Sequence, residues 1–216
     1  ILMKYHKLVE NAKKPNGFWG KMMIKAMNKG HSSLTSWGLE HMNVERTATV
    51  LDIGCGGGKT VDRLCSIVAN GKVYGIDYSE LSVKSSEKLN SKNILCNKAK
   101  ILQASVSDMP FENNTFDNIT AVETYYFWPD KENDVKEVFR VLKQGGTVML
   151  LFEMLRTDDD PFKWEKVENM LNIKSVTPQE IRAVLESTGF VNINTYTKEG
   201  TTWLCATAQK PKDDEN

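Results

Sequence analysis

The chain has 216 residues, with 28 basic and 28 acidic side chains and a formal net charge of +0 at pH 7. Its length suits one α/β domain with a small appendage, and a hydrophobic content of 40% is enough to build a core. Nucleic-acid-binding proteins usually carry a basic excess, so the balanced charge disfavours a nucleic-acid substrate. No apolar run approaches the roughly 18 residues of a membrane span and no signal-peptide pattern opens the chain, so we expect a cytoplasmic protein without a membrane segment.

The chain divides into three parts by pattern. Apolar residues at broad helical spacing over 18–28 predict a helix, and a second helix is expected over about 33–42. This arm, residues 1–43, is too short for an independent domain. We expect a main domain over residues 44–210 and a polar tail over 211–216.

From Thr49 onward, short apolar runs alternate with amphipathic stretches, which is typical of a parallel sheet with helices between its strands. A capping box at Thr177 to Glu180 opens the last helix, and Lys198 to Gly200 have the composition of a hairpin turn. We interpret the polar residues 157–176 as an insertion over the site. The strands are expected at 49–53, 72–76, 99–104, 117–122, 146–153, 190–197 and 202–208, and the helices at 58–69, 80–91, 131–142 and 177–188.

The most informative stretch is residues 50–58, which read VLDIGCGGG. An apolar run ending in Asp52 predicts a buried strand, and the glycines after it let the backbone turn sharply and approach a ligand. Asp77 ends the next expected strand, where a carboxylate can accept both hydroxyls of a ribose. The dinucleotide fingerprint would need a glycine at position 59, which is Lys59. The stretch therefore predicts a nucleoside pocket and disfavours a nicotinamide dinucleotide.

Four landmarks in order resemble the class I S-adenosylmethionine-dependent methyltransferases, close to their small-molecule branch. They are residues 50–58, Ile76 to Ser79, Met109 to Asp117, and Val141 to Gly146. The resemblance implies a Rossmann-like, seven-stranded, mostly parallel sheet whose last strand is antiparallel. It also implies that the N-terminal helical arm covers the cofactor as a lid. The implied cofactor is S-adenosyl-L-methionine, and its product is S-adenosyl-L-homocysteine.

The same resemblance assigns cofactor-binding roles to residues of the glycine turn and of the next strand end. The carbonyl of Gly54 would accept the cofactor's amino group. Asp77 would bind the ribose hydroxyls in a charge-assisted, bidentate way, and Tyr78 would pack on the adenine. The turn residues that would surround the methionine end are Asp52, Gly54, Cys55 and Gly56.

The adenine edge in such enzymes is read just after the third strand. The position that is often acidic in the family is Ser105 here, followed by Val106 and Ser107. A hydroxyl can still accept a hydrogen bond from the adenine amine, and the N–H of Val106 can meet a ring nitrogen. This departure from the family pattern puts cofactor affinity in question, though not the identity of the cofactor.

Candidates for chemistry lie near the carboxyl end of the fourth expected strand. There Glu123 could contact the cofactor or act as a base, and Tyr125 is a second catalytic candidate. His31 of the arm could accept a proton near neutral pH, although a capping or solvent-exposed histidine is the alternative. Substrate contacts are expected from Tyr126, Trp128 and Glu153, with a packed strand-to-helix corner as the alternative for the aromatic residues. The scattered histidines and cysteines predict no metal site.

These residues favour methyl transfer to a small organic acceptor by in-line displacement. A second hypothesis is a methyltransferase for RNA or protein, which the lysine-rich arm keeps open, although the Asn/Asp-Pro-Pro-aromatic motif of amino-methylating enzymes is absent. A third is a non-catalytic subunit that binds the cofactor. The sequence leaves the acceptor, the methylated atom and the oligomeric state open.

Overall fold

The computed structural model describes residues 17, 20, 22, 24 and 31–212. The expected helix over 18–28 lies mostly outside these residues, as does most of the polar tail. The strands are β1 (Thr49–Ile53), β2 (Lys72–Asp77), β3 (Ala99–Gln103), β4 (Phe116–Val122), β5 (Leu142–Phe152), β6 (Val191–Thr197) and β7 (Leu204–Gln209). The helices are α3 (Ser32–Leu39), α4 (Lys59–Ile67), α5 (Glu80–Leu89), α6 (Ser91–Leu95), α7 (Lys131–Val141), α8 (Glu165–Leu171) and α9 (Pro178–Thr188), with a 3-10 turn η1 (Tyr125–Phe127).

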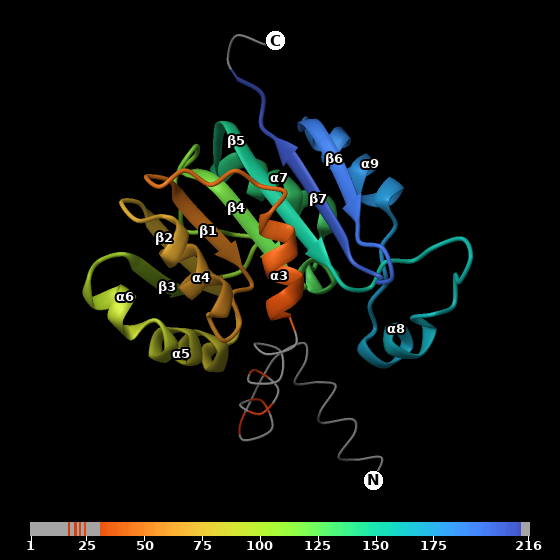
Figure 1. The fold of residues 1–216 in the computed structure, drawn as a ribbon, viewed down its shortest axis with the longest axis horizontal. Helices are drawn as coiled ribbons and strands as arrows, with labels where there is room; N and C mark the ends of the chain where they lie inside the picture. Colours follow the sequence, from red (N-terminus) through yellow and green to blue (C-terminus); the bar gives the residue numbers. More distant parts are fainter. Residues whose placement is uncertain (1–16, 18–19, 21, 23, 25–30, 213–216) are drawn as a thin grey trace.

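The strands form one seven-stranded sheet in the order β3-β2-β1-β4-β5-β7-β6 (Figure 1). The pairs from β3 to β5 are parallel, whereas β7 runs antiparallel to both β5 and β6. This confirms the expected Rossmann-like sheet with an antiparallel last strand. The strand order reverses between β1 and β4, and ligands of such sheets bind at the carboxyl ends of the strands at that point.

Strand β1 lies in the middle of the sheet and is covered on both faces. Val50, Leu51 and Ile53 are all buried although neighbouring side chains point to opposite faces. Figure 1 shows α3 and α4 in front of the sheet and α7 and α9 behind it. Asp52 is only 1% exposed in the same strand, and a buried carboxyl of this kind needs hydrogen-bond partners.

Most element boundaries differ from the expected ones by a few residues, and the short helix α6 was not expected. The end of α5 has an identifiable reason. Helix α5 ends at Leu89 because the buried Asn90 turns its side chain toward the glycine turn. Its Nδ2 donates to the carbonyl oxygens of Gly58 and Ser86, each at 3.0 Å. Strand β5 begins earlier than expected, at Leu142, and its register with β4 shifts before the regular pairing resumes.

The C-terminal part confirms the predicted capping box. The Thr177 hydroxyl accepts the N–H of Glu180 at 3.1 Å, and the Glu180 carboxylate accepts the N–H of Thr177 at 2.9 Å. Residues 157–176 contain the short helix α8, which Figure 1 places to one side of the sheet, apart from α3. The Trp164 indole N–H donates to the Leu155 carbonyl at 3.0 Å and anchors this segment.

Candidate active site

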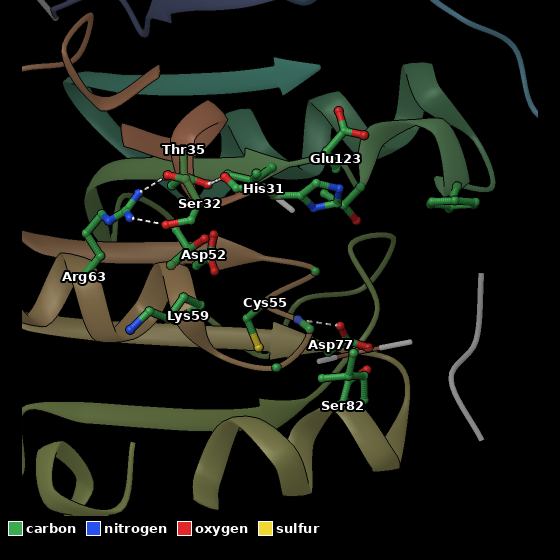
Figure 2. A pocket seen from close by; sticks show the side chains of 18 of the residues that line it. His31, Ser32, Thr35, Asp52, Cys55, Lys59, Arg63, Asp77, Ser82 and Glu123 are labelled. Atoms are coloured by element: carbon green, nitrogen blue, oxygen red, sulfur yellow. Dashed lines mark hydrogen bonds between the residues drawn. The ribbon is translucent and has the colours of Figure 1, made fainter. Parts of the chain in front are cut away.

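Two neighbouring cavities lie at the carboxyl ends of β1, β2 and β4. They share Gly54, Asp77, Tyr78, Thr124 and Phe127, so they are two lobes of one cleft. The first lobe, drawn in Figure 2, runs from the glycine turn to the start of α3 and is narrow, about 90 Å³. The second lobe lies beside the end of β3 and holds about 370 Å³. No residue of 157–176 lines either lobe.

The glycine turn forms the floor of the first lobe. Gly54, Gly56 and Gly58 have φ values of +66°, +51° and +81°, a region that other residues rarely adopt. A Cβ on Gly54 would lie 2.2 Å from the Thr124 hydroxyl oxygen, and one on Gly58 would meet Ser86. A Cβ on Gly56 would meet no atom closer than 4.0 Å, so that glycine is required by its backbone conformation alone.

Asp77 joins the end of β2 to this turn. Its Oδ2 accepts the backbone N–H of Gly56 at 2.9 Å (Figure 2). Its Oδ1 accepts the backbone N–H of Ser79 at 2.8 Å. Burial raises the pKa of the Asp77 carboxyl, and these two hydrogen bonds oppose that rise. Asp77 lines both lobes, so a ligand that spans the cleft would pass beside it.

Asp52, in strand β1 just before the glycine turn, also lines the first lobe. Its Oδ1 accepts the hydroxyl of Thr120 at 2.7 Å, which orients the carboxyl. Burial raises the pKa of Asp52 to about 7. A cationic ligand group beside Asp52 would favour its ionised form, as the α-ammonium of S-adenosylmethionine would.

The second lobe brings together most of the residues expected around adenine. Tyr78, Ser105 and Val106 line it, together with Phe127 from η1. Ser107 lies outside both lobes, and its N–H donates to the Ser105 hydroxyl at 3.2 Å. Ser107 therefore supports the turn, and its expected contact with the cofactor has no geometric support.

Two cations of α4 line the first lobe and were missed by the sequence reasoning. Arg63 donates to the carbonyl and to the hydroxyl of Ser32, both at 2.9 Å, and so connects α4 to the start of α3 (Figure 2). Lys59 lies one helical turn earlier and pairs with Asp62 at 3.0 Å. Their i, i+4 spacing directly after the glycine turn was the available signal. Such cations suit the carboxylate of the cofactor's methionine end.

Glu123 follows β4 with φ +57°, a conformation that costs a non-glycine residue about 1–2 kcal/mol. Its Oε1 accepts the N–H of Glu153 and, at 3.4 Å, the hydroxyl of Tyr126. Burial raises the pKa of Glu123 to about 8, which favours the protonated carboxyl when no ligand is bound. The strained backbone turns this side chain toward the first lobe.

His31 and Glu153 lie beside Glu123. The His31 Nε2 is 3.8 Å from the Glu153 Oε2, and burial lowers the pKa of His31, an effect that the Glu153 carboxylate partly opposes. Figure 2 shows the imidazole close to Glu123. The tertiary structure thus gathers three of the predicted site residues, although they come from the start of α3 and from the ends of β4 and β5.

The remaining aromatic candidates are mainly packed. Tyr125, Tyr126 and Trp128 are 4–5% exposed and contact one another or Phe152. The Tyr126 hydroxyl accepts the N–H of Met154 at 2.9 Å, which holds the strand ends together. Trp128 lines the second lobe, whereas Tyr125 and Tyr126 line neither lobe. Their predicted roles in catalysis and substrate binding have no geometric support, because neither residue lines the cleft, although the Tyr126 hydroxyl reaches Glu123.

The comparisons with known proteins agree with this geometry. Residues 51–150 match the family model described as a methyltransferase domain. The chain is 26% identical over 183 residues to an uncharacterized methyltransferase, YdaC, of Bacillus subtilis, covering 84% of this chain and 93% of that protein. It is 33% identical over 114 residues to a demethylmenaquinone methyltransferase of Geobacillus stearothermophilus, covering 52% of this chain and 48% of that protein, so it spans about half of that relative.

A solved structure agrees in fold. A SAM-dependent methyltransferase from Aquifex aeolicus superimposes with a TM-score of 0.67 and 21% identity, over 86% of this chain and 95% of that one. Among the helices of the described residues, none combines the length and the apolar character that crossing a bilayer requires.

Proposed function

Because the chain is a class I S-adenosylmethionine-dependent methyltransferase, we propose that it transfers the cofactor's methyl group to a small organic acceptor that enters beside His31 and Glu123. The observation that carries the proposal is the gathering of these two side chains in the first lobe, at the end of the cleft away from the adenine side. The narrowness of this lobe supports a small acceptor group. The relatedness to a demethylmenaquinone methyltransferase is a further, indirect support for a small molecule.

The cofactor would lie across both lobes. Its adenine would occupy the second lobe against Tyr78 and Val106, and its ribose would bind Asp77. Its ammonium group would lie near Asp52, and its carboxylate near Arg63. This placement directs the methyl group toward His31 and Glu123.

The reaction is an in-line displacement at the methyl carbon, which the positively charged sulfur of the cofactor has already activated. A lone pair of the acceptor forms a bond to the methyl carbon, and the electrons of the breaking C–S bond go to sulfur. The protein's main contribution is to hold both partners in line, which can supply several kcal/mol of the barrier. An acceptor that carries a proton must also lose it to a base.

His31 is the better base of the two. Burial lowers its pKa, so the imidazole is neutral and can accept a proton at neutral pH. The protonated form of Glu123 is favoured there, since burial raises its pKa to about 8, and this form can instead donate a hydrogen bond to the acceptor. We therefore assign proton acceptance to His31 and acceptor orientation to Glu123.

The test uses S-adenosylmethionine with a radioactive methyl group and separate pools of metabolites, RNA and protein. We expect label in the metabolite pool only. A His31→Gln variant should keep cofactor affinity and lose at least tenfold in rate, because loss of a general base typically removes about 10²–10⁴-fold. Label in the RNA or protein pool, or in none of the three, would overturn the small-molecule assignment.

A further inference from the structure

We propose that His31, Glu123 and Glu153 form a binding site for a divalent first-row transition-metal ion at the edge of the first lobe, which His31 and Glu123 line and beside which Glu153 lies. Each residue offers one ligand atom, and these three atoms all lie within 4.8 Å of one another. The side chains come from three separate elements and converge at the end of the cleft where the acceptor is expected. The inference rests on the proposed function for the role of the metal, but the site itself stands on these three residues.

Among the described residues, the three side chains keep lone pairs that accept no hydrogen bond. The hydrogen bonds to Glu123 reach its Oε1 and leave its Oε2 without a partner among the described residues. The ion pair of the Glu153 carboxylate within the described residues is with the His31 imidazole, at 3.8 Å. Within the described part of the chain, no lysine or arginine nitrogen lies within 4.0 Å of either carboxylate. The cluster therefore offers ligand atoms for a cation, and among the described residues no lysine or arginine lies beside it.

The geometry suits a metal ion at the centre of the cluster. Ligand atoms about 2.0–2.3 Å from a metal lie roughly 3–4 Å from one another, so small side-chain rotations would bring the three atoms into range. The backbone holds Glu123 in place, because its Oε1 accepts the N–H of Glu153 and that strand end is fixed by Tyr126 and Met154. Hydrogen-bonded carboxylates of this kind are typical metal ligands.

The donor set also indicates the type of metal. One imidazole nitrogen with two carboxylate oxygens suits manganese, iron, cobalt or zinc in the divalent state. Magnesium and calcium prefer oxygen ligands throughout. Three protein ligands leave open positions, which water and an oxygen or nitrogen atom of the acceptor would fill. With the metal bound, His31 would be a ligand and no longer the base. The metal would instead hold the acceptor's nucleophilic atom near the methyl group and lower the pKa of the proton on that atom, which would then pass to water.

The test measures manganese binding to the full chain, freed of metals with a chelator and loaded with S-adenosylhomocysteine. Free Mn²⁺ is followed by electron paramagnetic resonance during a titration. We expect one Mn²⁺ per chain. The variants Glu153→Gln and His31→Gln should each weaken binding about tenfold or more, since even residues that only support metal ligands change affinity by about 10–100-fold.

Two matched controls separate the cluster from general charge effects. Glu132→Gln removes an exposed carboxylate at the start of α7, and His41→Gln removes a histidine that stacks on Tyr196. Both should bind Mn²⁺ as the wild type does. In the wild type, bound Mn²⁺ should broaden the imidazole NMR signals of His31 more than those of His41.

The outcome is decisive even if one variant fails to fold. Glu153→Asp keeps the charge and should bind more tightly than Glu153→Gln, with circular dichroism as the check on folding. The site is refuted if the wild type binds less than one Mn²⁺ per chain or if cluster variants and controls bind equally. Manganese binding without methyl transfer to metabolites would support the metal site and refute the proposed function. Methyl transfer in the presence of a chelator, by a chain that does not bind Mn²⁺, would support the proposed function and refute the metal site.

Discussion

The Asp77 carboxylate and the backbone N–H of Gly56 form a 2.9 Å hydrogen bond that joins the end of β2 to the turn after β1. Asp77 also lines both lobes of the cleft. The acid that should bind the ribose therefore also fixes the conformation of the turn beneath it. A substitution at Asp77 should therefore change both the affinity for the cofactor and the conformation of the glycine turn.

Replacing Asp77 by Asn should weaken S-adenosylhomocysteine binding by about 1–3 kcal/mol, because charge-assisted hydrogen bonds to the ribose are lost. Isothermal titration calorimetry measures the change. Asp108→Asn is the control, since it removes an exposed carboxylate near the third strand end that lines neither lobe. Equal affinities for the wild type and Asp77→Asn would contradict the assigned ribose site.

Gly54→Ala should lower the free energy of unfolding by more than a glycine-to-alanine change costs at a similar positive φ without a steric clash. The new Cβ would lie 2.2 Å from the Thr124 hydroxyl oxygen at a φ of +66°. Gly200→Ala is the matched control, because Gly200 has φ +70° and a Cβ there would meet no atom within 4 Å. We expect a loss of about 1–2 kcal/mol for the control and a further 1–3 kcal/mol for Gly54→Ala, measured by urea unfolding. Similar losses would show that the turn has room to move.

Asp52 should make the cofactor-free protein less stable as pH rises. Burial raises the pKa of Asp52 from 3.8 to about 7, so between these values the folded state binds more protons than the unfolded state. The free energy of unfolding therefore decreases with rising pH across that window. Asp52→Asn removes this dependence and keeps an oxygen for the Thr120 hydroxyl.

At pH 8 we expect Asp52→Asn to be more stable than the wild type by up to a few kcal/mol. The difference should shrink as the pH falls toward 4, where Asp52 is protonated in both states. Urea unfolding without cofactor across this pH range is the measurement. A difference that does not change with pH would mean that Asp52 is ionised throughout.

Arg63→Gln should weaken the binding of ligands that carry the methionine carboxylate. Loss of a hydrogen bond to a charged group changes the binding free energy by about 1.5–3 kcal/mol. The matched ligand is methylthioadenosine, which keeps the adenosine and lacks the amino-acid end, and its affinity should not change. If both ligands lose affinity equally, Arg63 acts through its contacts with Ser32 and the position of α3.

Most of the sheet could be predicted because its signals are local. The β1 strand and the capping box at Thr177 agree with the structure, since apolar runs and cap residues act over a few neighbours. The boundary at Leu89 could not be predicted, because Asn90 ends α5 by bonding to a carbonyl of the distant glycine turn. The buried position of the Tyr126 side chain also could not be predicted, since its hydroxyl accepts the N–H of Met154, just after the end of β5.

By itself, the sequence determined the succession of the seven strands, the glycine turn and the acid at the end of β2, because periodicity and spacing along the chain encode them, whereas the short helices α6 and α8 had no such signal. Only the tertiary structure decided that His31, Glu123 and Glu153 meet, that Arg63 contacts the start of α3, and that Glu123 adopts a positive φ. The physical reason is that the packing of elements far apart in the chain directs these side chains, and no local pattern records that packing.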